Sequence, residues 1–405
     1  MINTAREMNI GTIVIDGNCE APGLKVADKS KNIDFSNLTV VYKYINSLLD
    51  KDINVCGVST MGSDVPHLLA AISDKYNWNG PSIETGRLTT NKYYMKQKLS
   101  QNGIPVPRFA LINRFEEIDK YWEQWKCNML VIKPTDRAGS RGVRLLNKKE
   151  NIKRDYNYAL SNSNIDEVMI EEYIEGHQIS TETILYDDFC STPGFADRVY
   201  QNMESFYPQI MENGGWVPSN HSKSDIKNVK ELVERASRAL GIKRGVAKGD
   251  VVLHQQNGPM IIEIAARLSG GDFCESLVPL SSGINYVSDV IRMAIGKKPD
   301  YDILATKSSK NTVANRYFFL PPGPLEEIVG IESINQLPEV QKIDLYYEPG
   351  DTIVKIDAHG QRAGVFVIVS KNRASTQELI DYVYENVKFR IDDKWHIGNP
   401  KYYVA

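Results

Sequence analysis

Apolar residues in the first hundred positions fall into short runs separated by amphipathic stretches. Residues 10–16 form a β-branched run closed by polar loop residues, typical of a buried parallel strand with a ligand-facing edge at its end. A helix-like stretch at 38–49, a second apolar run at 53–58 and a helix-like stretch at 65–75 follow. This alternation predicts βα units around a parallel sheet.

The remainder of the chain predicts sheets with helices packed against them, an α+β arrangement. A helix at 89–101, with Thr89 or Thr90 as its N-cap, precedes a strand-rich region. Strands are expected at 129–133, 143–146, 168–173, 179–185, 251–254 and 260–265, and helices at 115–125 and 226–240. The part beyond residue 311 indicates a small closing lobe with a strand pair, 352–357 and 365–370, and a final helix, 376–386.

The start of the chain argues against a dinucleotide-binding fold. It opens on a helix-like segment, residues 4–9, and not on a strand followed by a glycine-rich turn. Because that turn carries the phosphate-binding fingerprint of the fold, a nicotinamide cofactor is not expected.

Length and composition predict a soluble globular protein of two or three lobes. The 405 residues are too many for one ordinary core, and 42% apolar with 24% charged residues is an ordinary globular balance. The net charge of −3 and the scattered basic residues favour no nucleic-acid or membrane partner. Five widely spaced cysteines, no long apolar run and no signal-peptide pattern predict a cytoplasmic protein with reduced thiols.

The strongest local motif is a lysine at the end of a strand followed by a glycine-containing loop, VIKPTDRAGSRGV at residues 131–143. Such a loop can place backbone N–H groups on phosphate oxygens, and Lys133 supplies a point charge beside them. The glycines allow close backbone approach, and Ser140 and Arg141 add donors at the tip. Alone, the pattern fits an exposed basic hairpin equally well.

A second motif places two carboxylates on neighbouring strands. Asp250 and Glu263 lie on strand-like segments joined by a turn at 257–259, so a hairpin would bring them together. Paired carboxylates repel unless a cation lies between them, and their hard oxygens suit Mg²⁺. Arg267 points into the same site if the strand continues, where it can stabilise a transferring phosphoryl group. The alternative is a surface hairpin with a salt bridge.

A third segment, VMIEEYIEGHQIS at 168–180, is an apolar strand that leads into acidic residues and a glycine. Taken in order, the three motifs resemble the ATP-grasp superfamily, and the match covers nearly the whole chain. The resemblance implies an α/β and α+β fold with three parts. These are a Rossmann-like preATP-grasp domain at 1–85, an ATP-grasp domain of two α+β subdomains at 86–305, and a small C-terminal α+β lobe at 306–405.

The resemblance also implies which groups contact the ATP phosphates. Lys92, on the helix that opens the grasp region, and Lys133 match the two lysines of the family. Ser140, Arg141 and Gly142 match the mobile loop that covers the phosphates.

The hinge strand is expected to hold the nucleoside. Glu171, Glu172 and Ile174 would line the adenine, through backbone groups and the Glu171 side chain. Gln178 replaces the acid that usually binds the ribose hydroxyls, and an amide retains that contact with less charge. Ala265 replaces the usual asparagine of the late hairpin, which leaves open whether one or two Mg²⁺ ions bind.

The implied activity is that of an ATP-dependent ligase. A substrate carboxylate becomes an acyl phosphate, with Lys133 and Arg267 as catalytic groups, and an amine then takes the acyl group. The expected partners are ATP, Mg²⁺ and small-molecule carboxylate and amine substrates, with a homodimer as the default assembly. Two alternatives stay open at this stage: a bicarbonate-activating, carboxylase-like or carbamoyl-phosphate-forming enzyme, and an inactive ATP-binding regulatory module.

Overall fold

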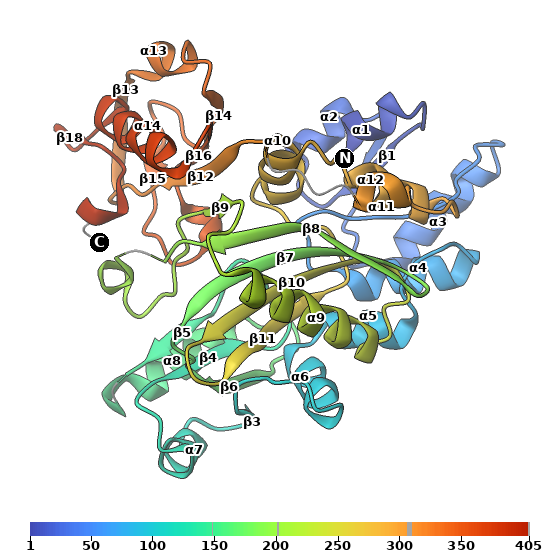
Figure 1. Cartoon of the computed structure of the whole chain (residues 1–405), viewed down its shortest axis with the longest axis horizontal. Coiled ribbons are helices and arrows are strands. Elements are labelled where there is room, and N and C mark those ends of the chain that lie inside the picture. Colours follow the sequence, from blue (N-terminus) through green and yellow to red (C-terminus); the bar gives the residue numbers. More distant parts are fainter. Residues whose placement is uncertain (148, 201, 306–309, 404–405) are drawn as a thin grey trace.

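The computed structural model of the chain describes residues 1–147, 149–200, 202–305 and 310–403. Three regions follow one another along the sequence: a helical lobe with two short strands, a central region of two sheets, and a C-terminal lobe (Figure 1). The expected α/β and α+β fold is confirmed. The division at residues 85 and 305 stays a prediction, and residue 306 lies outside the described residues.

The N-terminal lobe contains a parallel two-stranded sheet, β1 (Ile13–Asp16) and β2 (Lys29–Asn32). Around it lie the helices α1 (Ile2–Glu7), α2 (Pro22–Val26), α3 (Leu38–Leu49) and α4 (Pro66–Tyr76). The helix predicted at 38–49 is confirmed at both ends. The apolar run at 53–58 does not supply a strand to the expected βα units, because this segment joins no sheet. Its backbone packs instead against α11 (Val287–Ala294): a Cβ on Gly57 would lie 2.2 Å from the Ala294 carbonyl oxygen.

The smaller central sheet is antiparallel, in the order β3-β6-β4-β5. Its strands are β3 (Phe109–Ile112), β6 (Val168–Glu172), β4 (Leu130–Pro134) and β5 (Arg144–Leu146). The helices α7 (Glu117–Trp125) and α8 (Ile152–Asn162) bury their apolar sides against it. The strands predicted at 129–133, 143–146 and 168–173 are therefore confirmed.

The larger sheet has eight strands in the order β11-β10-β7-β8-β9-β12-β16-β14 and extends into the C-terminal lobe (Figure 1). The strands are β7 (His177–Tyr186), β8 (Phe189–Arg198), β9 (Gly215–Val217), β10 (Arg244–His254), β11 (Gly258–Ala265), β12 (Thr312–Phe318), β14 (Val340–Leu345) and β16 (Gly364–Ser370). The amphipathic helix α9 (Lys223–Ala239) covers one face with Val229, Leu232 and Val233. The opposite face packs against η3 (Phe273–Leu277), α10 (Val278–Ser282) and α11 over part of its area, through residues such as Ile184 and Val246.

The helix predicted at 89–101 is divided in two, α5 (Ile83–Thr90) and α6 (Lys92–Gln101). The residue between them is the N-cap of α6: the Asn91 side chain accepts hydrogen bonds from the N–H groups of Tyr93 and Tyr94, at 3.0 and 3.1 Å. The predicted caps, Thr89 and Thr90, lie inside α5. The Lys92 N–H donates to the Thr135 carbonyl at 2.8 Å, so the start of α6 is tied to the glycine loop.

The C-terminal lobe adds β13 (Gly323–Val329), β15 (Thr352–Ile353), β17 (Lys388–Ile391) and β18 (Lys394–His396) with α13 (Ile331–Asn335) and α14 (Arg373–Asn386). The strand pairing predicted between 352–357 and 365–370 is wrong, because β15 pairs with β13 and β16 pairs with β12 and β14.

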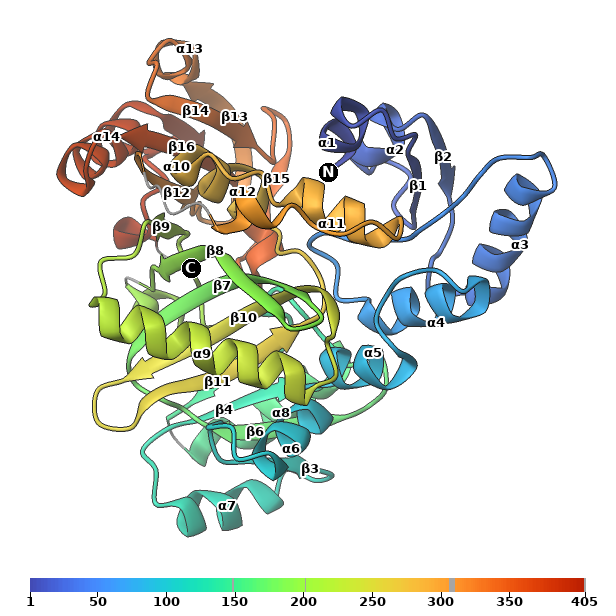
Figure 2. The same ribbon diagram turned by 45° about the vertical axis from the view of Figure 1, so that its right-hand side comes forward.

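Four short helices, η3 (Phe273–Leu277), α10 (Val278–Ser282), α11 and α12 (Tyr301–Ala305), connect the central region to the C-terminal lobe. Figure 2 shows α11 between the N-terminal lobe and the larger sheet. Within the described ranges, no helix combines the length and hydropathy needed to cross a membrane.

Candidate active site

A cavity of about 360 Å³, here called the polar cavity, lies between the two central sheets. Its walls come from β4 and β6 on one side and from β7, β10 and β11 on the other, with the glycine loop also contributing. Eight of the predicted site residues line it: Lys92, Lys133, Ser140, Glu171, Glu172, Ile174, Gln178 and Glu263. The remaining four, Arg141, Gly142, Asp250 and Arg267, are not among its lining residues.

Two lysines share one buried carboxylate at the base of this cavity. Glu171, on β6, forms ion pairs with Lys133 on β4 and with Lys96 on α6, the latter at 2.8 Å. Burial alone would raise the pKa of Glu171, but the two lysines hold it below its usual range. The Glu171 carboxylate is thus already engaged, and its predicted contact with adenine stays a prediction.

Lys96 was missed by the sequence reasoning. It is completely buried, and burial lowers its pKa to about 8 against the opposing effect of Glu171. Its Nζ also donates to the Ile262 carbonyl at 2.9 Å. A signal was present: Lys96 follows Lys92 by four positions, so both lie on the same face of one helix.

The two predicted metal carboxylates lie directly opposite each other on β10 and β11. Directly opposed residues of an antiparallel pair point to the same face, so Asp250 and Glu263 are neighbours, as the hairpin predicted. Each is balanced by a lysine: Lys248 pairs with Asp250, and Lys92 lies 3.0 Å from Glu263. Ser180 Oγ donates to Asp250 at 2.7 Å. Burial would raise the pKa of Glu263, but the lysines, led by Lys92, lower it strongly.

This donor set fits Mg²⁺. Two carboxylates on one face supply hard oxygen ligands, and Mg²⁺ takes its other ligands from phosphates and water. Within the described ranges no group of three or more His, Cys, Asp or Glu residues could hold a metal ion, so the protein provides no complete cage. Binding through Asp250 and Glu263 would therefore depend on the nucleotide, and their role as ligands stays a prediction.

Arg267 reaches the same cluster by a different route from the one expected. The strand ends at Ala265, so Arg267 lies beyond it and not on its face. Its Nε donates to Asp64 Oδ1 at 2.9 Å, and Asp64 Oδ2 lies 3.8 Å from Lys92 Nζ. Burial would lower the pKa of Arg267, but Asp64 and Glu263 raise it. Asp64, from the N-terminal lobe, was missed by the sequence reasoning.

The glycine loop is held from two sides. Ser140 Oγ donates to the Ile210 carbonyl at 2.9 Å, and the His359 N–H of the C-terminal lobe donates to the Gly139 carbonyl at 3.1 Å. Gly142 has φ +74°, and a Cβ there would lie 2.6 Å from Pro134 Cγ, so only glycine fits.

Arg141 is exposed, and its Nε donates to the Ala138 carbonyl at 3.0 Å. Burial and the charge of Arg137 lower its pKa, against the opposing effect of Asp64. Its predicted contact with the phosphates stays a prediction.

The hinge residues at and after the end of β6 point in different directions. Glu172 forms a bidentate ion pair with Arg108, at 2.7 and 2.9 Å, while the Ile174 side chain is buried in the cavity wall. A Cβ on Gly176 would lie 2.4 Å from the Leu253 carbonyl oxygen, so the turn into β7 requires glycine. Gln178, at the start of β7, lines the cavity where the ribose contact is predicted.

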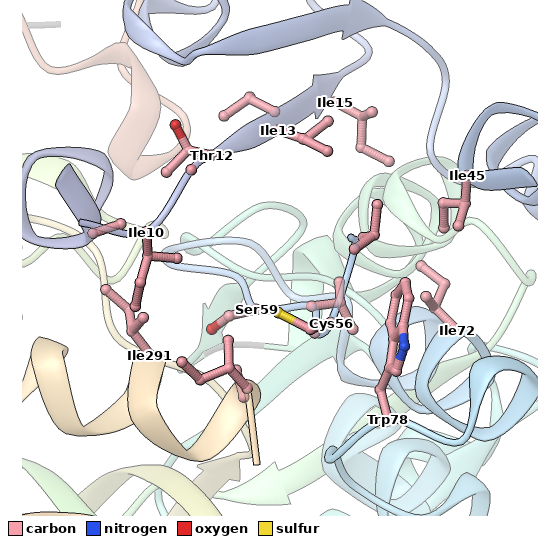
Figure 3. A pocket seen from close by; sticks show the side chains of 18 of the residues that line it. Ile10, Thr12, Ile13, Ile15, Ile45, Cys56, Ser59, Ile72, Trp78 and Ile291 are labelled. Atoms are coloured by element: carbon pink, nitrogen blue, oxygen red, sulfur yellow. The ribbon is translucent and has the colours of Figure 1, made fainter. Parts of the chain in front are cut away.

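A second cavity, of about 270 Å³, lies in the N-terminal lobe between β1, α3 and the 53–58 segment. Figure 3 shows isoleucines of β1 and α3 facing Cys56 and Trp78 across it. Among the described residues that line it, none has a charged side chain. The ligand-facing edge expected at 10–16 is thus the wall of an apolar space, here called the apolar cavity.

Trp216, on β9, could stack on a substrate or serve only in packing. It is buried, and the guanidinium groups of Arg316 and Arg373 lie 4.6 and 5.1 Å from its ring centre. The segment 269–275 leads into η3, beside the end of β11. Trp216 therefore packs against two arginines, and it also lines a cavity that Gln178 borders.

Comparison with known proteins finds two family models in this chain. Residues 89–271 match the ATP-grasp domain, and residues 316–392 match L-amino acid ligase C-terminal domain 2. The protein y4rH of Sinorhizobium fredii is 25% identical over 89% of this chain and 73% of its own length. An L-arginine-specific L-amino acid ligase of Bacillus subtilis is 22% identical over 68% of this chain and 65% of its own length.

Solved structures share the fold over nearly the whole chain. The L-amino acid ligase of Bacillus licheniformis superposes with a TM-score of 0.82 at 17% identity, covering 95% of this chain and 94% of its own. A phosphoribosylglycinamide synthetase of Anaerococcus prevotii gives 0.72 at 23% identity and 96% of both chains. The chain therefore carries an ATP-grasp domain followed by an L-amino acid ligase C-terminal domain, which confirms the predicted ATP-grasp resemblance.

Proposed function

We propose that this enzyme uses Mg-ATP to convert a carboxylate into an acyl phosphate and transfers the acyl group to an amine. The observation that carries the proposal is the convergence of Lys92, Lys133 and Glu263 on one cavity between two sheets, with Asp250 beside Glu263. Buried charges are costly unless they are paired. The cationic side chains gathered here are suited to a polyanionic ligand, whose phosphates would take the place of the carboxylates that now pair with them.

In the first step a substrate carboxylate oxygen attacks the γ-phosphorus and the bond to ADP breaks. Lys92 and Lys133 hold the phosphates, and Arg267 offsets the charge that develops on the transferring group. Asp250 and Glu263 would hold Mg²⁺, which would neutralise charge on the triphosphate. The three cations are fixed in advance by Asp64, Glu171 and Glu263, so little reorganisation is needed.

In the second step the amine nitrogen attacks the acyl carbon, phosphate leaves and the nitrogen loses a proton. Because an acyl phosphate reacts readily with water, the site must be closed before this attack. The glycine loop is suited to that closure, since Gly139 and Gly142 allow it to move while Ser140 and His359 hold it in place.

Amino acids are the first substrates to test. The C-terminal domain matches that of L-amino acid ligases, and one relative is named as an L-arginine-specific L-amino acid ligase. An assay of ADP and phosphate release with amino acids and small acids, singly and in pairs, identifies both substrates when a pair works and neither member does. Release that depends on bicarbonate alone would favour the bicarbonate-activating alternative. ATP binding without any release would favour a regulatory module.

Lys133→Ala and Glu263→Gln test the site directly. Each should lower substrate-dependent ADP release by about 100-fold or more, the effect expected for removing one group that stabilises the transition state. The matched controls are Lys227→Ala and Glu231→Gln, an exposed ion pair on α9, which should leave turnover unchanged. Near-normal turnover in both site variants would remove the assignment.

Two further expectations are proposals of the same kind. A homodimer is the default assembly for a soluble enzyme, and light scattering at several protein concentrations tests it. A cytoplasmic location fits the reduced state of five free cysteines, two of them exposed, and cell fractionation tests it.

A further inference from the structure

A fully buried carboxyl lies in the middle of β7, outside the polar cavity. Glu182 has no exposed surface. In the strand register it lies opposite Lys248 on β10 and opposite Gly194 on β8. Gly194 makes room for it, because a Cβ there would lie 2.8 Å from Glu182 Cβ. The neighbours on the same side include Ile184 and Ala196, so an apolar side chain would suit this position.

The carboxyl has one strong partner. The Ser269 N–H donates to Glu182 Oε1 at 2.6 Å, within the segment that follows Arg267. Oε2 has no hydrogen-bond partner among the described residues, nor do Ser269 Oγ and Tyr286 Oη beside it. Burial raises the pKa of Glu182 to about 7, against the opposing effects of the Ser269 N–H hydrogen bond and of the charges of Arg267 and Lys248. A buried carboxyl with one unpartnered oxygen lowers the stability of the fold, so a functional role is the reason to look for in its contact with Ser269.

The segment that Glu182 holds connects two parts of the active site. The Leu268 carbonyl accepts from Arg267 Nη1 at 3.1 Å and from the Gly62 N–H at 3.0 Å. Arg267 in turn binds Asp64, two positions after Gly62. The backbone at 268–269 therefore fixes both the guanidinium and the loop that carries its carboxylate partner.

We propose that Glu182 is a positioning residue, whose carboxyl fixes the Ser269 backbone and thereby holds Arg267 and the Gly62–Asp64 loop in register with Glu263. This inference rests on the proposed function for its kinetic readout. It assigns no contact between Glu182 and substrate. An acceptor at this position maintains the geometry, whereas an apolar side chain of similar size fills the space and releases the segment.

Glu182→Leu and Glu182→Gln separate positioning from stability. Leucine replaces a costly buried carboxyl, so the thermal midpoint should stay at or above that of the wild type. Its kcat should fall about 30-fold with the KM for ATP within about 2-fold, because a displaced catalytic group affects the transition state more than nucleotide binding. Glutamine retains the acceptor for the Ser269 N–H and should keep kcat within about 3-fold of the wild type.

Wild-type kcat in Glu182→Leu would overturn the proposal, as would a parallel rise in the KM for ATP. If the wild type itself releases no ADP with any substrate, the proposed function fails, and hydrogen exchange then decides the inference. Amides at 268–271 and 61–64 should exchange faster in Glu182→Leu than in the wild type or Glu182→Gln. Equal exchange in all three proteins would refute the positioning role.

Discussion

The apolar cavity of the N-terminal lobe and the polar cavity between the central sheets are of comparable volume and opposite chemistry. The apolar cavity, about 270 Å³, is lined by side chains such as Ile13 and Ile15, and it borders a segment that forms no strand. The polar cavity, about 360 Å³, gathers Lys92, Lys133 and Glu263 from separate parts of the chain. Buried charged side chains need partners of opposite charge nearby. The apolar side chains that line the other cavity need no such partners.

The two cavities also differ in how their walls are held in place. Around the polar cavity four cations have a carboxylate partner within 4 Å: Lys133 and Lys96 share Glu171, and Lys92 and Arg267 share Asp64. The apolar cavity is bounded on one side by β1, which pairs with β2 alone among the described strands. The two cavities are therefore distinguished by the ion-pair network and not by their volumes.

Asp64→Ala should give the largest effect, because this residue brings the N-terminal lobe to the polar cavity. Its loss leaves Arg267 and Lys92 with one carboxylate fewer, and breaking such a buried pair costs on the order of 3 kcal/mol of stability. Turnover should fall by about 100-fold, since Arg267 is no longer held in place. The measurements are ADP release and chemical denaturation.

Asp28→Ala is the matched control in the same lobe. Asp28 is fully exposed and accepts hydrogen bonds from Thr12 at the edge of the apolar cavity. Its removal should leave turnover unchanged. If Asp64→Ala also turned over normally, the N-terminal lobe would contribute no charge to the site, and the contrast between the cavities would lose its functional meaning.

Leu99→Ala and Ile13→Ala compare packing in the two regions. Leu99, on α6, is fully buried in the apolar cluster that includes residues of α9. Its truncation should therefore destabilise the protein by about 3 kcal/mol. Ile13 is only partly buried and already borders an open space, so the loss there should be about 1 kcal/mol. Denaturant midpoints followed by two probes measure both losses and reveal any separate unfolding of the lobes. Equal losses would mean that the apolar cavity is packed as tightly as the core.

The sequence predicted the elements whose pattern is local. The helix at 38–49 has a polar N-cap and an amphipathic repeat, and the hairpin of β10 and β11 has a turn between alternating strands. The segment 53–58 has the same apolar character, but Gly57 packs against α11, more than two hundred residues away. Tertiary contacts of this kind override strand propensity and leave no mark in the segment itself.

The candidate site shows the same limit. Lys133, Asp250 and Glu263 could be identified because a strand, a loop and a hairpin place them. Lys96 could also have been predicted, because helical spacing places it beside Lys92. Asp64 was not: it precedes the proline that opens α4 and resembles an ordinary helix-start residue, while its partner Arg267 lies 203 positions later.

Cys56→Leu should give the smallest effect and tests whether the apolar cavity is spare volume. Cys56 faces this cavity from the 53–58 segment (Figure 3), so a larger apolar side chain can fill part of it. Stability should rise by about 0.5–1 kcal/mol, typical of cavity filling, with ADP release unchanged because no residue of the ion-pair network is touched. The control is Cys19→Leu, also a free exposed cysteine but outside this cavity, which should leave the thermal midpoint unchanged. A loss of turnover in Cys56→Leu alone would show that the apolar cavity serves the reaction, and the division drawn between the two cavities would then be wrong.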